Sequence, residues 1–458
     1  MRITSKLLRS TVVGALGGFL FGFDTVVISG TTEQLRQVFH LTPTSFAWTM
    51  SIALCGTVAG CFIAGPLGQR FGSRNILRGL AVLYILSALG CAFAANWPML
   101  MVARFIGGLG IGGSSVLGPV YIAELAPATW RGRLVGAFQI NIVIGILVAY
   151  ISNWYIAGLG LGANEWRWQL GVAVFPAIIF FVMLFTIPQS SRFLITQDSL
   201  DDALAVIKAM GSDRPEAELA EIRASMHREQ DAAVEPLFKR TLRLPIFLAV
   251  SIGFFNQLSG INAVLYFAPR IFEMTGLGEK AALLQSVGIG IANLVFTFVG
   301  LWLIDRLGRR TLLYIGSFGY IISLGLTAWA FFTQHYAIVP VCIFAFIGAH
   351  AVGQGAVIWV LISEIFPNRH RAEGQALGSF THWIFAALLT TFFPKMVTAF
   401  APGYVFAFFA FMMGLQLIWV KTFVPETKGI SLEEMQHKLG IDVEPEPVAE
   451  PLARMQKV

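Results

Sequence analysis

The amino-acid sequence predicts an all-α membrane protein with twelve transmembrane helices in two pseudo-symmetric six-helix halves, joined by short cytoplasmic helices. Of its 458 residues, 56% are hydrophobic and only 13% are charged, whereas soluble chains carry about 25% charged residues. In addition, several loop motifs of the first half recur in the second half at a nearly constant spacing. The composition argues against a cytosolic enzyme, a disordered protein or a nucleic-acid-binding protein.

Twelve stretches meet the requirement of a spanning helix for roughly 20 mainly apolar residues. They lie near residues 10–30, 47–67, 76–95, 98–120, 134–157, 168–187, 244–268, 282–304, 312–332, 338–362, 374–396 and 403–423. The first stretch follows basic residues, as a signal peptide does. It contains Asp24 and lacks an A-x-A cleavage site, so we expect it to remain as a helix.

The positions of the basic residues predict the orientation of the spans. If the N-terminus is inside, 26 of the 32 lysines and arginines fall in inside segments and five in outside segments. This asymmetry predicts that both termini are cytoplasmic. It also accounts for the net charge of +6, so no nucleic-acid partner is required.

The spans divide the chain into four parts. These are an N-terminal half (1–188), a cytoplasmic linker (189–243), a C-terminal half (244–424) and a cytoplasmic tail (425–458). Within the linker we expect one helix from Ser199 to Met210 and another from Pro215 to Arg228. The tail is predicted to be solvated rather than folded. No phosphate-binding G-x-x-x-x-G-K-[ST] motif occurs in the sequence, so ATP is not the expected energy source.

Three pairs of loop motifs indicate an internal repeat. The segment around Arg70 recurs 236 residues later at Arg306, that of Glu124 recurs 240 later at Glu364, and Pro188-Gln189 recurs 237 later as Pro425-Glu426. Both halves start inside, so they are parallel repeats, which place a substrate site at the midplane and work by rocking. A purely structural role for the motifs is the alternative to a gate. The candidate gate or latch residues are Arg70, Glu124, Arg131, Arg192, Asp305, Arg306, Arg309, Glu364, Arg371 and Glu426.

Seven motifs in order make the chain resemble the sugar porter branch of the major facilitator superfamily along essentially its whole length. They are G-F-D-T-V-V-I-S-G (22–30), R-F-I-G-G-L-G-I-G (104–112), Y-I-A-E-L-A-P (121–127), N-Q-L-S-G-I-N (256–262), D-R-L-G-R-R (305–310), S-E-I-F-P (363–367) and P-E-T-K-G (425–429). Two positions depart from the family pattern, since Gln69 replaces an Asp and Gln189 replaces a Glu. The loss of these acids predicts weaker latching in the N-terminal half.

Asp24 and Arg104 are charged residues at membrane depth, where a charge is costly and usually functional. Each lies about four residues outward of the centre of its span, so we expect them to pair. A carboxyl group buried alone favours its protonated form, whereas one beside a guanidinium favours the ionised form. Rocking that separates and restores the pair would therefore couple proton movement to transport. The resemblance implies the same, because proton-coupled sugar porters carry these two residues. A static buried salt bridge is the alternative.

The seventh span carries the candidate sugar site. Four of its polar side chains share an arc of ~120° on a helical wheel: Asn256, Ser259, Asn262 and Tyr266. Gln257 falls outside this arc unless Gly260 breaks the helix and turns it inward. Such a face lines either a cavity or a helix contact, because buried amides in lipid need partners. Neutral amides suit sugar hydroxyls, because they both donate and accept hydrogen bonds.

The resemblance implies further sugar contacts outside this span. The residues at these contact positions are Gln139, Asn293, Trp359 and Trp383, together with the intramembrane pair His350 and His382. For the histidines, hydrogen bonding to sugar, a pH-sensing or proton-relay role and a simple helix–helix hydrogen bond all stay open. Ala356 replaces a usual proline, which leaves the position of a break in the tenth span open.

The expected function is a transporter that imports a monosaccharide, a hexose or xylose, together with protons. A facilitative uniporter is the alternative, and a non-transporting sugar sensor is a remote one. We expect no enzyme activity and no cofactor. The expected partners are a monosaccharide, a proton and the lipid bilayer, with the protein a monomer. No N-x-[ST] sequon occurs, which favours a bacterial inner membrane.

Overall fold

The structure is a computed structural model that describes residues 4–127, 130–231, 236–367, 370–430 and 432–441. Within these ranges every regular element is a helix, and twelve helical segments are long and apolar enough to cross a membrane. The prediction of an all-α protein with twelve spans is confirmed.

The helices before the linker form the first of two groups. They are α1 (Ser5–Val27), η1 (Ile28–Thr31), α2 (Thr32–Val38), α3 (Pro43–Phe71), α4 (Ser73–Ala92), α5 (Trp97–Leu125), α6 (Arg131–Gly158), η2 (Gly162–Asn164), α7 (Glu165–Gly171) and α8 (Val174–Met183). The second group is η3 (Arg240–Leu242), α12 (Arg243–Leu258), α13 (Ile261–Glu273), α14 (Glu279–Leu307), α15 (Arg309–Thr333), η4 (Tyr336–Ile338), α16 (Val339–Val352), α17 (Gln354–Ile365), α18 (Arg371–Ala399) and α19 (Pro402–Thr422).

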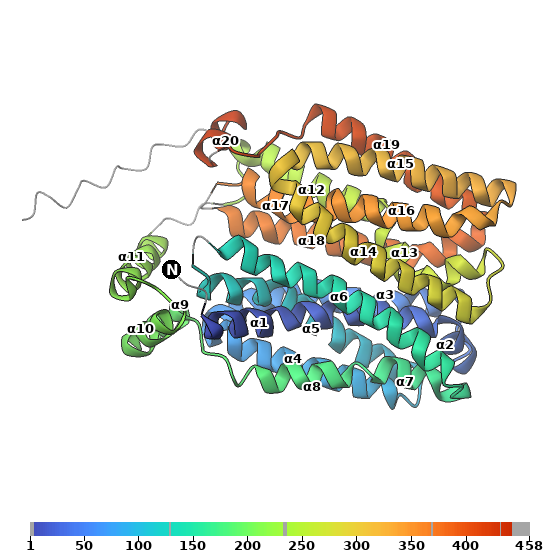
Figure 1. The fold of residues 1–458 in the computed structure, drawn as a ribbon, viewed down its shortest axis with the longest axis horizontal. Coiled ribbons are helices and arrows are strands. Elements are labelled where there is room, and N and C mark those ends of the chain that lie inside the picture. The colour runs from blue at the N-terminus through green and yellow to red at the C-terminus, as the bar shows by residue number, and fades with distance from the viewer. Residues whose placement is uncertain (1–3, 128–129, 232–235, 368–369, 431, 442–458) are drawn as a thin grey trace, which may run out of the picture.

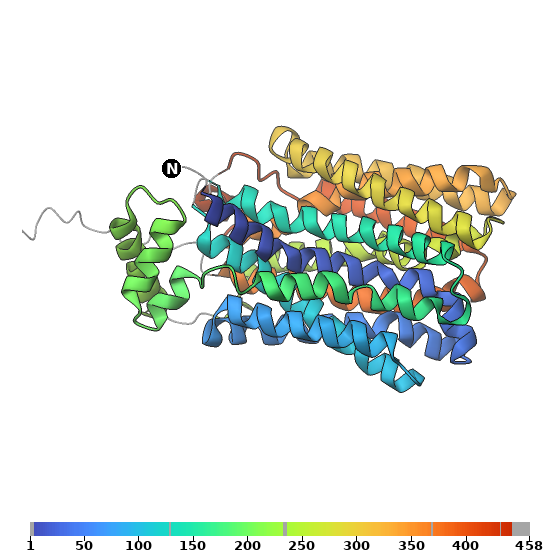
Figure 2. The same cartoon turned by 60° about the horizontal axis from the view of Figure 1, so that its bottom comes forward.

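The two groups lie side by side with their helices roughly parallel to one long axis (Figure 1). Between them, α6 contacts α14 and α3 contacts α18. The linker helices α9 (Ser191–Thr196), α10 (Leu200–Ala209) and α11 (Pro215–Asp231) cover one end of the bundle (Figure 2). The described N-terminal residues lie at the same end, which we call the linker face, and the other end is called the opposite face.

Glycines bring neighbouring helices into backbone contact. A Cβ atom on Gly108 of α5 would lie 2.0 Å from the carbonyl oxygen of Ala53 in α3, and one on Gly112 would lie 2.1 Å from that of Thr57. In lipid, where no hydrophobic effect drives helices together, such close approach supplies the packing energy. The α3–α5 pair is therefore held by residues that tolerate no larger side chain.

At the opposite face the two groups touch directly. The hydroxyl of Tyr150 in α6 donates to the carbonyl oxygen of Leu265 in α13 at 2.7 Å. The rings of Phe46 and Phe267 also meet across the groups, with centroids 6.2 Å apart. The halves are thus in contact at the face away from the linker.

Several spans differ in detail from the expected ranges. The sixth is divided into α7 and α8, and the tenth into α16 and α17. In the tenth span the break lies at Gly353, whose ψ of −103° is not helical. The seventh span is broken at Gly260 between α12 and α13, which is the condition that the sequence sets for Gln257 to turn inward.

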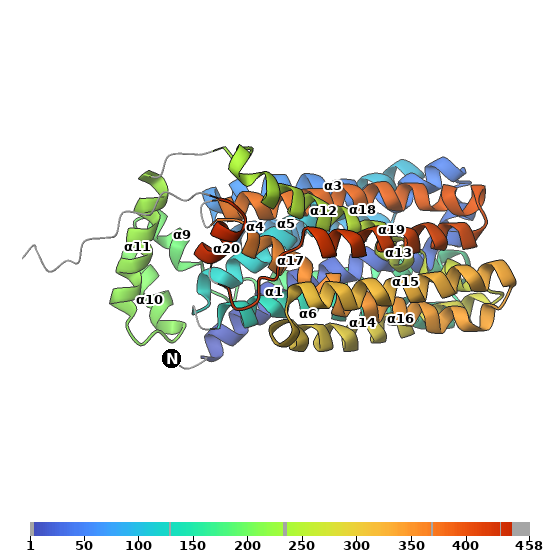
Figure 3. The same ribbon diagram turned by 90° about the horizontal axis from the view of Figure 1, so that it is seen from above.

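The two expected linker helices are present as α10 and α11, and α9 precedes them. Lys208 in α10 lies 3.0 Å from Glu216 in α11, and its hydrogen bond lowers the pKa of that carboxyl group. The prediction of a wholly solvated tail is wrong for its first part, where α20 (Leu432–Lys438) packs near α17 at the linker face (Figure 3). This part of the tail folds because it carries apolar side chains that can be buried, namely Met435, Leu439 and Ile441. Residues 442–458 lie outside the described part.

Candidate functional site

Asp24 of α1 and Arg104 of α5 form a buried ion pair. Nη1 of Arg104 donates to Oδ1 of Asp24 at 2.9 Å, and Nη2 lies 3.5 Å from the main-chain oxygen of the same residue. The Arg104 side chain is 1% exposed and that of Asp24 is 12% exposed. The structure therefore brings together the two charges whose equal depth was inferred from the sequence.

The pair leaves polar atoms unpartnered. Oδ2 of Asp24 and Nε of Arg104 are buried without a hydrogen-bond partner among the described residues. The hydroxyl of Tyr266 in α13 is also buried without a hydrogen-bond partner among the described residues, and it lies within electrostatic range of both members of the pair. Buried polar groups normally have hydrogen-bond partners. These atoms, near the interface between the two groups of helices, can therefore form additional hydrogen bonds.

The break at Gly260 shapes the candidate sugar site. Gly260 has φ +87°, a left-handed conformation in which side chains are strained, and a Cβ there would lie 2.6 Å from the ring of Phe409. The break turns the chain so that Gln257, which a straight helix would direct elsewhere, is buried beside Asn262. Glycine is thus required at this position for both its backbone conformation and its size.

Three amide side chains of the seventh span form one cluster. Nε2 of Gln257 donates to Oδ1 of Asn256 at 3.0 Å, and Nδ2 of Asn262 donates to Oε1 of Gln257 at 2.8 Å. Ser259 instead bonds the main chain, donating to the carbonyl oxygen of Asn256 at 2.6 Å. The cluster accordingly includes Gln257 and excludes the hydroxyl of Ser259.

His382 of α18 joins this cluster to two tryptophans. Both of its ring nitrogens lie 3.2 Å from Nε2 of Gln257. Its ring centroid is 5.3 Å from that of Trp359 in α17 and 4.8 Å from that of Trp383. Phe21 of α1 reaches Trp383 from the other group of helices at 5.3 Å. Amide, imidazole and indole groups therefore adjoin one another next to the interface between the groups.

His350, the other intramembrane histidine, has a different partner. Its Nδ1 lies 2.6 Å from the hydroxyl of Tyr320 in α15, so this ring takes part in a helix–helix hydrogen bond. Asn293 of α14 is buried and Gln139 of α6 is half-buried. No side-chain hydrogen bond was found for Asn293 or Gln139 in the part of the chain that the structure describes.

Sequence reasoning overlooked a second polar chain in the same group of helices. Gln354 donates to Gln416, and Gln416 donates to the hydroxyl of Ser317 at 2.9 Å. All three side chains are fully buried. Gln354 and Gln416 could have been recognised as members of such a chain, because a single amide within an apolar span needs a hydrogen-bond partner in lipid. Tyr320 was also overlooked, since a lone tyrosine carries no comparable signal.

At the linker face, the candidate latch residues of the second half form one network. Nη2 and Nε of Arg309 donate to the two carboxylate oxygens of Glu364 at 2.7 and 3.0 Å. Nη1 of Arg309 reaches Asp305 at 3.4 Å. Glu426 accepts hydrogen bonds from the backbone N–H groups of Arg309 and Arg310 at 2.9 and 3.1 Å. The bidentate contact between Arg309 and Glu364 is of the strong, charge-assisted kind.

Other contacts are seen at the remaining candidate latch residues, of which Arg192 and Arg371 each have an interaction partner. Arg306 stacks on Trp302 and Arg70 on Phe71, with 3.9 and 5.2 Å between guanidinium carbon and ring centroid. Arg131 and Arg371 begin α6 and α18, respectively. Glu124 interacts with Arg192 of α9 and accepts a hydrogen bond from Ser73 at 3.4 Å. None of the ion pairs found among the described residues joins the two groups of helices.

The arrangement as a whole suits a small polyhydroxylated ligand. Neutral amides offer both donors and acceptors, and indole rings offer apolar faces. Among the described residues, no group of three or more His, Cys, Asp or Glu side chains is placed to hold a metal ion.

The sequence of this chain is similar to those of known transport proteins. Residues 10–439 match the family described as "Sugar (and other) transporter". The chain is 35% identical to the arabinose-proton symporter of Bacillus subtilis over 428 residues, which cover 92% of each chain. It is also 35% identical to the glucose transporter GlcP of Staphylococcus epidermidis over 93% of this chain and 96% of that one.

Solved structures agree with the sequence comparisons. The inward-open structure of the Escherichia coli xylose transporter XylE matches with a TM-score of 0.84 at 33% identity, over 94% of this chain and 99% of that one. The structure of XylE bound to 6-bromo-6-deoxy-D-glucose matches with a TM-score of 0.80 at 32% identity, over 96% and 100%. The chain belongs to the sugar porter family of the major facilitator superfamily.

Proposed function

We propose that this protein is a monomeric secondary transporter that imports a monosaccharide together with a proton across a bacterial inner membrane. The observation that carries the proposal is the buried Asp24–Arg104 ion pair, which has within electrostatic range the Tyr266 hydroxyl, a buried group without a hydrogen-bond partner among the described residues. Tyr266 follows the break at Gly260 in the helix that holds the amide cluster. A shift of this helix on sugar binding would therefore move the Tyr266 hydroxyl relative to the ion pair.

Coupling follows from the chemistry of the pair. When the halves 1–188 and 244–424 rock about the site, loss of the guanidinium contact favours a protonated Asp24 carboxyl group. Return of the contact favours the carboxylate, so the proton is released on the other side. The 189–243 linker spans the two halves during this motion, and we assign the linker face to the cytoplasm on the distribution of lysine and arginine.

We assign sugar binding to the amide cluster and its neighbours. Asn256, Gln257 and Asn262 supply donors and acceptors for hydroxyl groups, and Trp359 and Trp383 supply apolar faces. His382, in contact with Gln257, is a further hydrogen-bonding group of the site. Gln139 and Asn293 contribute from the facing helices. His350 is assigned a supporting role, because its Nδ1 is already engaged with Tyr320.

The test is sugar transport by purified protein in proteoliposomes. Counterflow and uphill uptake of labelled glucose, fructose and xylose would be measured with and without an inward proton gradient, for wild type and Asp24→Asn. We expect wild type to accumulate a sugar only with the gradient. The variant should retain counterflow and lose accumulation, since it can bind sugar but cannot exchange a proton.

A different outcome would assign the ion pair a structural role. If wild type only equilibrates sugar, with or without the gradient, the protein is a uniporter and the Asp24–Arg104 pair fixes helix packing. Loss of counterflow in Asp24→Asn together with a normal elution profile would mean that the carboxylate is needed for binding or for rocking itself.

A further inference from the structure

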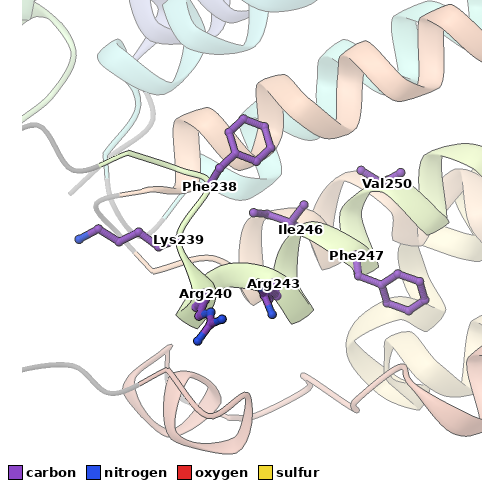
Figure 4. A pocket seen from close by; sticks show the side chains of 7 residues that line it. All are labelled: Phe238, Lys239, Arg240, Arg243, Ile246, Phe247 and Val250. Atoms are coloured by element: carbon purple, nitrogen blue, oxygen red, sulfur yellow. The ribbon is translucent and has the colours of Figure 1, made fainter.

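A pocket of about 410 Å³ lies at the linker-face end of α12, away from the amide cluster. Figure 4 shows its lining, which runs from the loop before η3 along the first turns of α12. The lining residues are Phe238, Lys239, Arg240, Arg243, Ile246, Phe247 and Val250. The pocket therefore combines a cationic end with an apolar end.

Two arginines supply the positive charge of this pocket. Arg240 and Arg243 are three residues apart, so their side chains lie on one face of the helix, and both are exposed. Figure 4 shows them next to each other at its start. The ion pairs found in the described ranges include neither of them, whereas Lys239 has an interaction partner of its own. Two guanidinium groups are thus available to an anion.

The apolar end continues along the membrane-spanning helix. Phe247 is 43% exposed, and its ring meets that of Phe423, at the end of α19, in an edge-to-face contact with centroids 5.2 Å apart. Phe423 is itself half exposed. An amphipathic ligand could therefore place its anionic group at the arginines and its hydrocarbon against these rings.

We propose that this pocket binds the phosphodiester headgroup of an anionic phospholipid from the leaflet at the linker face. Guanidinium groups bind phosphate through two parallel N–H···O bonds, which makes arginine the preferred partner. Basic pockets beside spanning helices are known to hold anionic lipid headgroups at the cytoplasmic surface. The acyl chains of the bound lipid would lie along Phe247 and Val250.

The first half of the chain offers a matched control. Lys6 and Arg9 stand 234 residues before Arg240 and Arg243, and they too are exposed at the start of the first span of their half. Removing either pair deletes two positive charges at the same face of the bundle. Only one pair lines the pocket, so the two double variants separate a specific site from the general attraction of a basic surface.

The experiment measures lipid retention by purified full-length protein. Native mass spectrometry would count bound dioleoyl phosphatidylglycerol, with dioleoyl phosphatidylcholine in parallel, for wild type, Arg240→Gln/Arg243→Gln and Lys6→Gln/Arg9→Gln. We expect wild type to prefer phosphatidylglycerol. The pocket variant should bind it about 30-fold more weakly, since each cation near a membrane surface strengthens binding about fivefold. The control variant should keep most of the preference.

Three results would overturn the site. Wild type that retains the two lipids equally has no anionic headgroup site. A pocket variant that keeps the preference places the bound lipid elsewhere. Equal losses in both variants would mean a diffuse surface-charge effect. The readout needs no sugar transport and no assigned orientation, so it is independent of the proposed function.

Discussion

In the second half of the chain the N-terminus of α15 faces a carboxylate, whereas in the first half the N-terminus of α4 faces an amide. Glu426 accepts the backbone N–H groups of Arg309 and Arg310. At the corresponding place, a Cβ on Gly72 would lie 2.3 Å from Nε2 of Gln189, and this nitrogen is buried without a partner among the described residues. A carboxylate satisfies the free donors of a helix N-terminus, while an amide nitrogen adds another donor.

The two halves also differ at the residue that follows this glycine, which is Arg309 after Gly308 and Ser73 after Gly72. Glu364 receives two hydrogen bonds from Arg309, at 2.7 and 3.0 Å. Its counterpart Glu124 receives a hydrogen bond of 3.4 Å from Ser73, which stands 236 residues before Arg309. Ser73 thus replaces the arginine with one longer hydrogen bond to the carboxylate, and the charged partner of Glu124, Arg192, comes from the linker helix α9.

The backbone is nevertheless the same in both places. Gly72 and Gly308 each precede the helix with a positive φ, +83° and +90°, a conformation that favours glycine. The comparison teaches that glycine geometry builds this turn and that charge only sets its strength. We therefore expect the first half to be held less tightly at the linker face, as the loss of its acidic residues predicts.

The largest expected effect comes from giving the second half the serine of the first. Arg309→Ser should lower the free energy of unfolding by about 3 kcal/mol, because it leaves the largely buried Glu364 carboxylate without its partner. Thermal unfolding of purified protein should shift by about 3 °C. Arg306→Ser is the matched control, since Arg306 stacks on Trp302 outside the network. Equal shifts in the two variants would contradict the importance of the charged pair.

A smaller effect is expected when the carboxylate at α15 becomes the amide found at α4. Glu426→Gln should destabilise the protein by about 2 kcal/mol, because hydrogen bonds to a charged group exceed those to a neutral one. Thermal unfolding measures the change. Glu434→Gln, which removes an exposed carboxylate at the same face, should have little effect. A Glu426→Gln protein as stable as wild type would show that an amide serves this turn equally well.

The reverse exchange should strengthen the first half. Gln189→Glu replaces the buried amide nitrogen beside Gly72 by an acceptor for the N–H groups that begin α4, and we expect a gain of about 1 kcal/mol. The melting temperature should rise, while Gln197→Glu, which adds an exposed carboxylate at the C-terminal end of α9, should not raise it. A lower melting temperature for Gln189→Glu would mean that the cost of burying the charge exceeds the benefit of the helix N-terminus.

Features that depend on local pattern could be predicted from the sequence. The twelve spans follow from apolar length, and the break at Gly260 follows from a glycine within a polar stretch. The approach of Asp24 to Arg104 follows from equal depth in two spans. The replacement of an arginine by Ser73 was overlooked, although the 236-residue repeat contained it.

Features that depend on distant side chains could not be predicted in this way. Gln257 and His382 are 125 residues apart, and their contact depends on how α12 and α18 pack. The same holds for Tyr320 and His350, which meet across two helices. Periodicity fixes the face on which a residue lies, but the partner on that face is decided by the packing of other helices. The roles of the predicted site residues stay predictions until transport is measured.

The smallest expected effect in this comparison concerns Asp305, which corresponds to Gln69 of the first half. Its carboxylate lies 3.4 Å from Nη1 of Arg309 but is 82% exposed, and such surface pairs contribute about 0.5 kcal/mol or less. Asp305→Gln should therefore shift the melting temperature by no more than about 1 °C. In an Arg309→Ser background it should have no effect at all, because the partner is gone. A loss in wild type as large as that caused by Arg309→Ser would make Asp305, rather than Glu364, the main partner of this arginine. The charge lost at Gln69 would then matter as much to the first half as the one lost at Gln189.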